Sequence, residues 1–195
     1  MHRTRKVVRT VVVLAALGGL ATLGAFSAFT SQADNENNRV QSGTVTLGEN
    51  DGGNVLYDMA NGKPGTASTP KCIRVAYSGS LDATVRLYRP TAVDADLAPH
   101  VNVLVESGSQ AVPNFDCTAF TPDAAGSEVY NGTLADLGAS YATGTEDFPG
   151  ALATKWVDGD AVVYRVTATI SSSAPDSAQG ADTGLHTLRW EAQNQ

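Results

Sequence analysis

The chain has 195 residues, with 13 Lys or Arg against 20 Asp or Glu and a formal net charge of −7 at pH 7. Four of the basic residues lie at the very start of the chain: Arg3, Arg5, Lys6 and Arg9. The remainder is therefore strongly acidic. This argues against nucleic acid or anionic lipid as a partner, because either would need a cationic face on the protein.

The N-terminal segment has the pattern of a signal peptide. Its cationic start is followed by an apolar run, Val11 to Leu23, and then by small residues. We predict a signal peptide over residues 1–28, cleaved between Ala28 and Phe29. Ala25 also supplies the small residue that must precede a cut. The alternative is a permanent membrane helix, which is less natural because small residues interrupt the apolar run.

Removal of this leader would leave 167 residues with 9 basic and 20 acidic side chains, a formal net charge of −11. A chain of this length can form one domain that buries about 70% of its unfolded surface. We expect a flexible N-terminal segment over residues 29–43 and a single folded domain over residues 44–195.

Two cysteines, Cys72 and Cys117, lie in the expected domain. In an exported chain an even pair predicts one disulfide bond rather than a redox or zinc site. The bond would close a loop of about 45 residues and, on a chain-entropy estimate, would stabilise the fold by roughly 4 kcal/mol. The alternative is two buried free thiols.

Apolar residues recur with a period of two along much of this part, which is the spacing of half-buried β-strands. In chain order, strands are predicted over residues 44–47, 55–59, 72–77, 81–87, 101–105, 162–170 and 185–192. The runs at 72–77 and 81–87 are separated only by Ser78-Gly79-Ser80, so we expect them to be neighbouring strands.

One short helix is expected over residues 133–141, where Thr133 and Asp136 have the spacing of an N-terminal cap. It would lie in a long connection, residues 107–154, that is rich in Ala, Gly, Ser, Thr, Asp and Pro. Seven or more short strands in a chain of this size favour an all-β fold, a single β-sandwich of the jelly-roll type. A closed β-barrel is the alternative.

Short segments spread along the chain resemble one known family. Around the expected cut, Phe26-Ser27-Ala28-Phe29-Thr30-Ser31 places small residues between two aromatic residues. The other segments are Asn38 with Gly43-Thr44-Val45-Thr46-Leu47, Asn61-Gly62-Lys63-Pro64-Gly65, Tyr77-Ser78-Gly79-Ser80-Leu81-Asp82-Ala83, and Gln179-Gly180 with Leu188-Arg189-Trp190-Glu191-Ala192. In this order and behind this leader, they resemble the TasA/camelysin family of exported Gram-positive proteins, which a dedicated, SipW-type signal peptidase matures.

The resemblance implies a secreted protein of the cell surface or biofilm matrix, with the signal peptidase as its processing partner. In the fibre-forming members the freed N-terminal segment is thought to add as a β-strand to the next subunit. The corresponding segment here is Phe29 to Asp34. We therefore expect a structural subunit that acts by self-assembly, or by attachment to matrix or cell-surface partners. The cysteine pair and the stretch at 107–154 depart from the better-known members.

No residue pattern in the chain predicts catalysis. Camelysin has been classed as a metalloprotease, but the H-E-x-x-H pattern of the common zinc proteases is missing, and only His100 and His186 remain outside the leader. The G-x-S-x-G pattern of a serine hydrolase is missing too. We expect no catalytic residues, no metal and no cofactor. A metal-dependent peptidase of the camelysin type remains an alternative.

Two further binding hypotheses concern calcium and carbohydrate. Acidic residues that could offer oxygen ligands to calcium are Asp94 with Asp96 and Asp158 with Asp160, but their spacing does not match an EF-hand, and we interpret them as solvated turn carboxylates. A carbohydrate- or surface-binding module would need exposed aromatic residues on one face. The candidates for that role, Tyr88, Tyr130 and Tyr141, are scattered along the chain.

Overall fold

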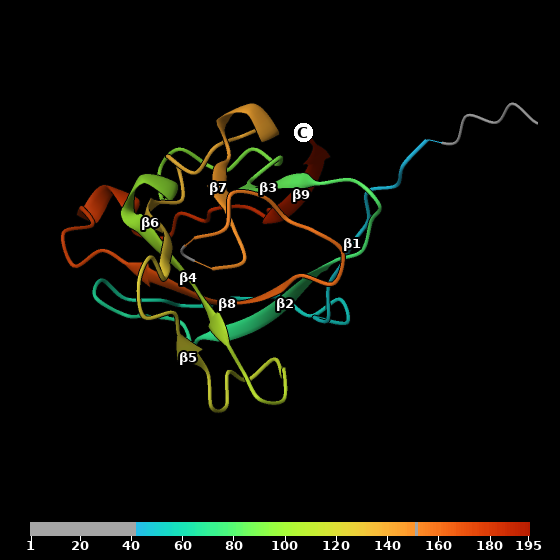
Figure 1. The fold of residues 1–195 in the computed structure, drawn as a ribbon. Helices are drawn as coiled ribbons and strands as arrows, with labels where there is room; N and C mark the ends of the chain where they lie inside the picture. The colour runs from blue at the N-terminus through green and yellow to red at the C-terminus, as the bar shows by residue number, and fades with distance from the viewer. Residues whose placement is uncertain (1–41, 151) are drawn as a thin grey trace, which may run out of the picture. The chain divides into compact units, whose positions relative to one another are not determined.

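The computed structural model describes residues 42–150 and 152–195. The expected signal peptide, its cleavage site at Ala28 and Phe29, and nearly all of the expected flexible segment lie outside the described residues. The described part is all-β, as the sequence predicts (Figure 1). Its strands are accompanied by three short 3-10 helices: η1 (Ala98–His100), η2 (Tyr141–Thr143) and η3 (Asp176–Ala178).

The larger of two antiparallel sheets has β2, β8 and β4 at its centre. In spatial order its strands are β1 (Leu47–Gly48), β2 (Lys71–Tyr77), β8 (Ala161–Ile170), β4 (Val101–Ser109) and β5 (Thr121–Pro122), and β6 (Glu128–Thr133) also pairs with β4. Every second side chain of β8 from Val162 to Ile170 is buried. This alternation shows that one face of the sheet forms the core.

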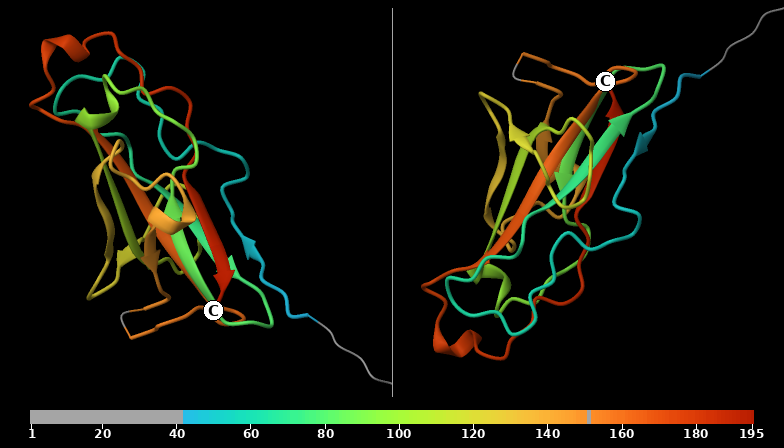
Figure 2. Two further views of the ribbon diagram at one scale, coloured as in Figure 1. Left: turned by 90° about the horizontal axis from the view of Figure 1, so that it is seen from above. Right: turned by 90° about the horizontal axis from the view of Figure 1, so that it is seen from below.

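The smaller sheet contains β7 (Thr145–Asp147), β3 (Ala83–Tyr88) and β9 (Arg189–Asn194), in the order β7-β3-β9. The two sheets form the layers of a sandwich, which the views from above and below show (Figure 2). Val85 and Leu87 of β3 are buried in one hydrophobic core with Val103 of β4 and Val166 of β8. The core therefore lies between the sheets.

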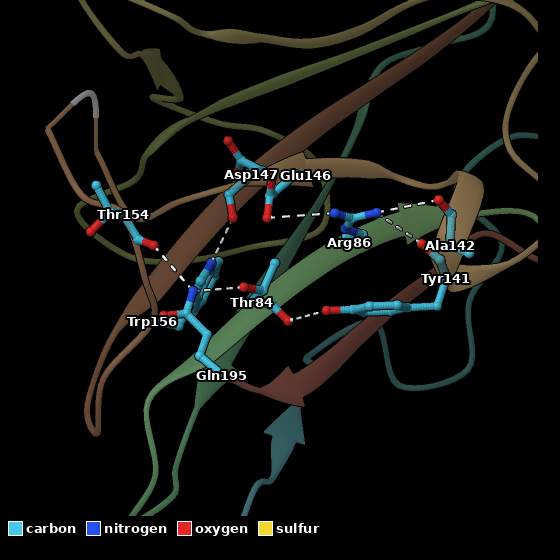
Figure 3. Close-up of polar contacts among 9 residues, drawn as sticks. All are labelled: Thr84, Arg86, Tyr141, Ala142, Glu146, Asp147, Thr154, Trp156 and Gln195. Atoms are coloured by element: carbon cyan, nitrogen blue, oxygen red, sulfur yellow. Dashed lines mark hydrogen bonds and ion pairs between the residues drawn. The ribbon is translucent and has the colours of Figure 1, made fainter.

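Trp156 is the largest side chain that is fully buried in this core. Its backbone pairs with Ala83 of β3, and its indole Nε1 donates to the carbonyl oxygen of Asp147 at 2.8 Å (Figure 3). The Asp147 carboxylate accepts a hydrogen bond of 2.7 Å from the buried Tyr164 hydroxyl. Burial raises the pKa of Asp147, and the hydrogen bond from Tyr164 opposes that rise.

Three predictions about the first half of the chain differ from the structure. The strand predicted over residues 44–47 is reduced to β1, which begins at Leu47. Residues 55–59 form no strand, although Tyr57 and Met59 pack against the core. The strands β2 and β3 are not neighbours either, because β2 belongs to the larger sheet and β3 to the smaller one. The turn after Tyr77 carries the chain from one layer to the other. A period of two predicts which face of a strand is buried, but not which sheet the strand joins.

The helix predicted over residues 133–141 is replaced by a turn followed by η2. The expected cap is present, since the Asp136 amide donates to Thr133 Oγ1 at 3.2 Å. Leu134 and Leu137 are buried, so a single turn already places both in the core. The chain then folds back at Gly138, where an added Cβ would lie 2.1 Å from the carbonyl oxygen of Thr143.

The stretch at 107–154 is more regular than the expected connection. It contains the end of β4 and all of β5, β6 and β7. The last strand is shifted relative to the prediction over 185–192, because β9 begins at Arg189 and residues 185–188 are irregular. In both places, pairing with β4 or β3 decides the strand limits, and this pairing is not visible in local residue patterns.

Candidate functional site

The smaller sheet leaves part of the inner face of the larger sheet to be covered by irregular chain. Residues 49–64, which follow β1, and residues 174–188, which precede β9, border this region. An open groove of about 1220 Å³ lies there. Ile73 and Val75 of β2 and Ala168 and Ile170 of β8 contribute to its lining. The groove therefore reaches the core of the sandwich.

The groove is lined by apolar side chains on the side of the core and by both apolar and polar side chains along its borders. The partly buried lining residues that pack against the core are Leu47, Leu56, Tyr57, Met59, Leu97, Ala174, Leu188 and Trp190. Two further apolar side chains in its lining are exposed, Val55 at 67% and Leu185 at 98%. These two side chains add exposed apolar surface to the borders of the groove.

One side-chain hydrogen bond connects the two irregular segments. The Tyr57 hydroxyl and Nε2 of His186 are 2.7 Å apart, and the two ring centroids are 5.5 Å apart. On the other side of the imidazole ring, Nδ1 lies 2.8 Å from the carbonyl oxygen of Gly184. Burial raises the pKa of Tyr57, and the nearby positive charge of Arg89 lowers it by a smaller amount. The hydroxyl therefore remains protonated at physiological pH.

Among residues 42–150 and 152–195, no strand pairs with one edge of β9. The amide of Gln195 donates to the carbonyl oxygen of Asp82, the residue opposite it. In an antiparallel ladder, hydrogen-bonded and non-hydrogen-bonded residue pairs alternate, so this bond identifies which residues of β9 direct their backbone groups toward β3. From this register, the backbone groups of Trp190, Ala192 and Asn194 point away from β3. They have no backbone partner among the residues that the structure describes. Because Trp190 also lines the groove, this free edge begins at the groove.

Contacts elsewhere in the smaller sheet hold β9 and β3 in place (Figure 3). The Gln195 side chain, just after β9, donates to Thr84 Oγ1 at 2.8 Å, and the Tyr141 hydroxyl donates to the carbonyl oxygen of Thr84 at 3.0 Å. Arg86 lies 3.8 Å from the Glu146 carboxylate on β7 and stacks on the Tyr141 ring. These contacts stabilise the smaller sheet, to which the free edge of β9 belongs.

Cys72 and Cys117 lie at disulfide distance, with sulfur atoms 2.18 Å apart and Cα atoms 5.0 Å apart. This arrangement fits the predicted bond. Cys72 is buried on β2, whereas Cys117 lies in an irregular loop between β4 and β5. The same loop is attached by an ion pair of 2.8 Å between Lys71 and Asp116. The cysteine pair thus fastens this loop to the larger sheet.

The structure gives the two histidines separate roles. His100 is the last residue of η1, and its backbone carbonyl oxygen accepts a hydrogen bond from the Ser171 amide at 2.7 Å. His186 lies in the segment before β9 and contacts Tyr57. Within residues 42–150 and 152–195, no three His, Cys, Asp or Glu side chains are grouped in a way that could hold a metal ion.

The acidic pairs and the tyrosines considered above form hydrogen bonds within the folded domain. Asp94 accepts from the Asp96 amide at 2.8 Å, and Asp160 accepts from the Val157 amide at 2.7 Å, which is the geometry of turn carboxylates. Asp158 accepts from the Gly79 amide at 3.3 Å. Each tyrosine hydroxyl also donates a hydrogen bond: Tyr88 to the Glu191 carboxylate, Tyr130 to the carbonyl oxygen of Thr133 and Tyr141 to the carbonyl oxygen of Thr84.

No protein-family model matches the chain, and no curated protein matches it. In the part of the chain that the structure describes, no helix has both the length and the apolar character needed to cross a membrane.

The sequence did not predict the groove or the contact between Tyr57 and His186. The apolar run 55–59 was a signal that this segment packs on the core, but its period of two favoured a strand. No local pattern links a tyrosine to a histidine 129 positions away. The free edge of β9 follows from the strand order, which depends on long-range pairing.

Proposed function

We propose that this chain is a secreted or cell-surface structural subunit, of the biofilm-matrix or fibre type, that acts by self-assembly. The N-terminal segment freed by the signal peptidase adds as a β-strand to the β9 edge of a second copy. The observation that carries this proposal is the unpaired edge of β9 beside an apolar groove.

Backbone hydrogen bonds favour this mode of contact. An unpaired strand edge is a template for another strand, and native proteins usually cover, shorten or charge such edges. An added segment would satisfy the outward-facing backbone groups of Trp190, Ala192 and Asn194, while its side chains enter the neighbouring pockets. The groove beside Trp190 offers such a pocket.

The chain itself contains a segment suited to this edge. Phe29 to Asp34 contains one large apolar side chain, Phe29, and one acidic residue. Six extended residues span about 20 Å, which matches the length of β9, also six residues. Asp34 begins a run of Asp, Asn and Glu over residues 34–38. These are poor strand formers, so residues 35–38 would serve as a flexible link between subunits.

Two observations favour export. The leader has the cationic and apolar parts of a signal peptide, and a cysteine pair at disulfide distance is typical of proteins in oxidising compartments. The formal charge of −11 after the expected cleavage is consistent with a partner that is neither nucleic acid nor anionic lipid.

The proposal is tested by deleting Phe29 to Asn38 from the leader-free chain and examining both proteins by electron microscopy and analytical ultracentrifugation. We expect the deletion to leave a folded monomer with unchanged β content and to abolish the assembly seen with the intact chain. A control chain with residues 35–38 replaced by Gly and Ser should still assemble, because the donor segment is unchanged and the link keeps its length. Equal assembly of the truncated chain would instead indicate contact through a face or loop of the sandwich, as in a surface-binding module.

A further inference from the structure

We propose that the edge of β2 is a second strand-binding surface, which the loop attached through Cys117 covers and which accepts the N-terminal segment of a second copy once it is uncovered. This loop spans residues 110–120, between β4 and β5, and is called the Cys117 loop below. The covering concerns a single chain, whereas the choice of occupant rests on the proposed self-assembly.

Most of β2 has no strand beside it on the side away from β8. There the two-residue strand β1 pairs with β2, opposite Ala76 and Tyr77. Among the described residues, no strand pairs on that side with the first five residues of β2, Lys71 to Val75. Without other cover, this part of β2 would be an open edge that could bind a further strand.

Two backbone amides of this edge are satisfied by groups outside any strand. The Cys72 amide donates to the carbonyl oxygen of Phe115, in the Cys117 loop, at 3.0 Å. The Arg74 amide donates to Oδ1 of Asn50 at 2.7 Å. Amides two positions apart in a strand point to the same side, so both of them point away from β8. The Cys117 loop and Asn50 therefore take the places that an added strand would use.

Contacts of three kinds hold the Cys117 loop at the start of β2. Cys117 lies at disulfide distance from the buried Cys72. Lys71 forms an ion pair of 2.8 Å with Asp116, and its Nζ lies 5.1 Å from the centre of the Phe115 ring. The ion pair contributes little to stability, because the Asp116 side chain is 78% exposed. The cysteine cross-link is therefore the contact on which the cover mainly depends.

Charge favours the N-terminal segment of a second copy as the occupant of the uncovered edge. The edge carries two cations, Lys71 and Arg74, in a chain with a net negative charge. Release of the loop would also separate Lys71 from Asp116. The proposed donor ends at Asp34 and is followed by Glu36, so its carboxylates complement these cations.

Amide hydrogen exchange, followed by NMR, tests the cover. It is measured on the leader-free chain without Phe29 to Asn38, which keeps every described residue and lacks the proposed donor. Replacing both cysteines by Ala should make the amide of residue 72 exchange at least about tenfold faster relative to that of Ile73, which points toward β8. A general loss of stability would accelerate both amides alike. An unchanged ratio would overturn the proposal.

A matched control keeps the cross-link. Asn50→Ala should accelerate exchange of the Arg74 amide and leave that of Cys72 unchanged, because each amide has its own cover. Equal acceleration of both would show that the Cys117 loop does not protect Cys72, and would also overturn the proposal. All samples contain sodium sulfate, which favours the folded state, and circular dichroism verifies that the β content is equal.

Sedimentation velocity tests the occupant on the full leader-free chain. Ala192→Pro removes an outward-facing amide of β9, so this variant should stay monomeric. Replacing both cysteines by Ala in the same chain should restore association through β2, and further deletion of Phe29 to Asn38 should abolish it. A chain that stays monomeric without its cysteines, or that associates without the donor, would overturn the proposed occupant. The proposed function fails separately, if the leader-free chain with no substitution does not assemble.

Discussion

Among single residues, the cysteines make the contact with the largest expected effect on stability. Cys72 is 1% exposed on β2, and Cys117 brings the loop between β4 and β5 against the outer face of the larger sheet. Cys117 has a φ of +57°, a backbone conformation that residues other than Gly rarely adopt. The surrounding contacts must hold this conformation, and the bond to Cys72 is one of them.

Replacing both cysteines by Ala should lower the free energy of unfolding by up to roughly 4 kcal/mol, because the cross-link restricts the unfolded chain over a loop of 45 residues. Urea unfolding of the variant, of the wild-type chain and of the wild-type chain with a reductant measures this effect. Circular dichroism should show the same β content in all three. Two alkylatable thiols in the secreted protein under non-reducing conditions would contradict the bond itself.

Tyr57 and His186 illustrate what residue patterns cannot show. Each was visible in the sequence, Tyr57 as part of an apolar run and His186 as one of two histidines outside the leader. Their contact joins two irregular segments that are far apart in the sequence, since the two residues are 129 positions apart. Such contacts are a property of the folded chain and leave no periodic signal.

At the scale of elements, the regular strands with clear alternation were predictable and their partners were not. Residues 72–77 and 162–170 were predicted as strands and form β2 and β8, since one face of each is buried in the core. The short strands β5, β6 and β7 were missed. Among their eleven residues only Val129 and Tyr130 are apolar, and these segments are extended because β4 or β3 pairs with them.

Ala192 offers a direct test of the β9 edge. Its amide points away from β3, so Ala192→Pro should remove the hydrogen that an added strand would use and leave the β3–β9 ladder intact. We expect this variant to fold and to assemble poorly. Ala192→Ser keeps the amide hydrogen and a similar volume, so it should assemble as the wild-type chain does. Sedimentation velocity compares the three proteins, and wild-type assembly of Ala192→Pro would exclude this edge as the acceptor.

At the scale of the whole molecule, the proposed self-assembly needs a donor and an acceptor. In this proposal the donor is the N-terminal segment Phe29 to Asp34, and the acceptor is the β9 edge with its groove. Contacts of this kind are head-to-tail, so they join subunits into open chains unless the rotation between subunits closes a ring. The all-β class was predictable from the periodicity, whereas the β9 edge could be located only from the order of strands in both sheets.

The most direct measurement of this claim mixes two variants that each lack one half of the contact. The chain without Phe29 to Asn38 keeps the acceptor, and the chain with Ala192→Pro keeps the donor. We expect each to sediment as a monomer alone and the mixture to form a one-to-one pair that grows no further. A mixture that stays monomeric, although the intact leader-free chain assembles, or a truncated chain that assembles alone would contradict strand addition at β9.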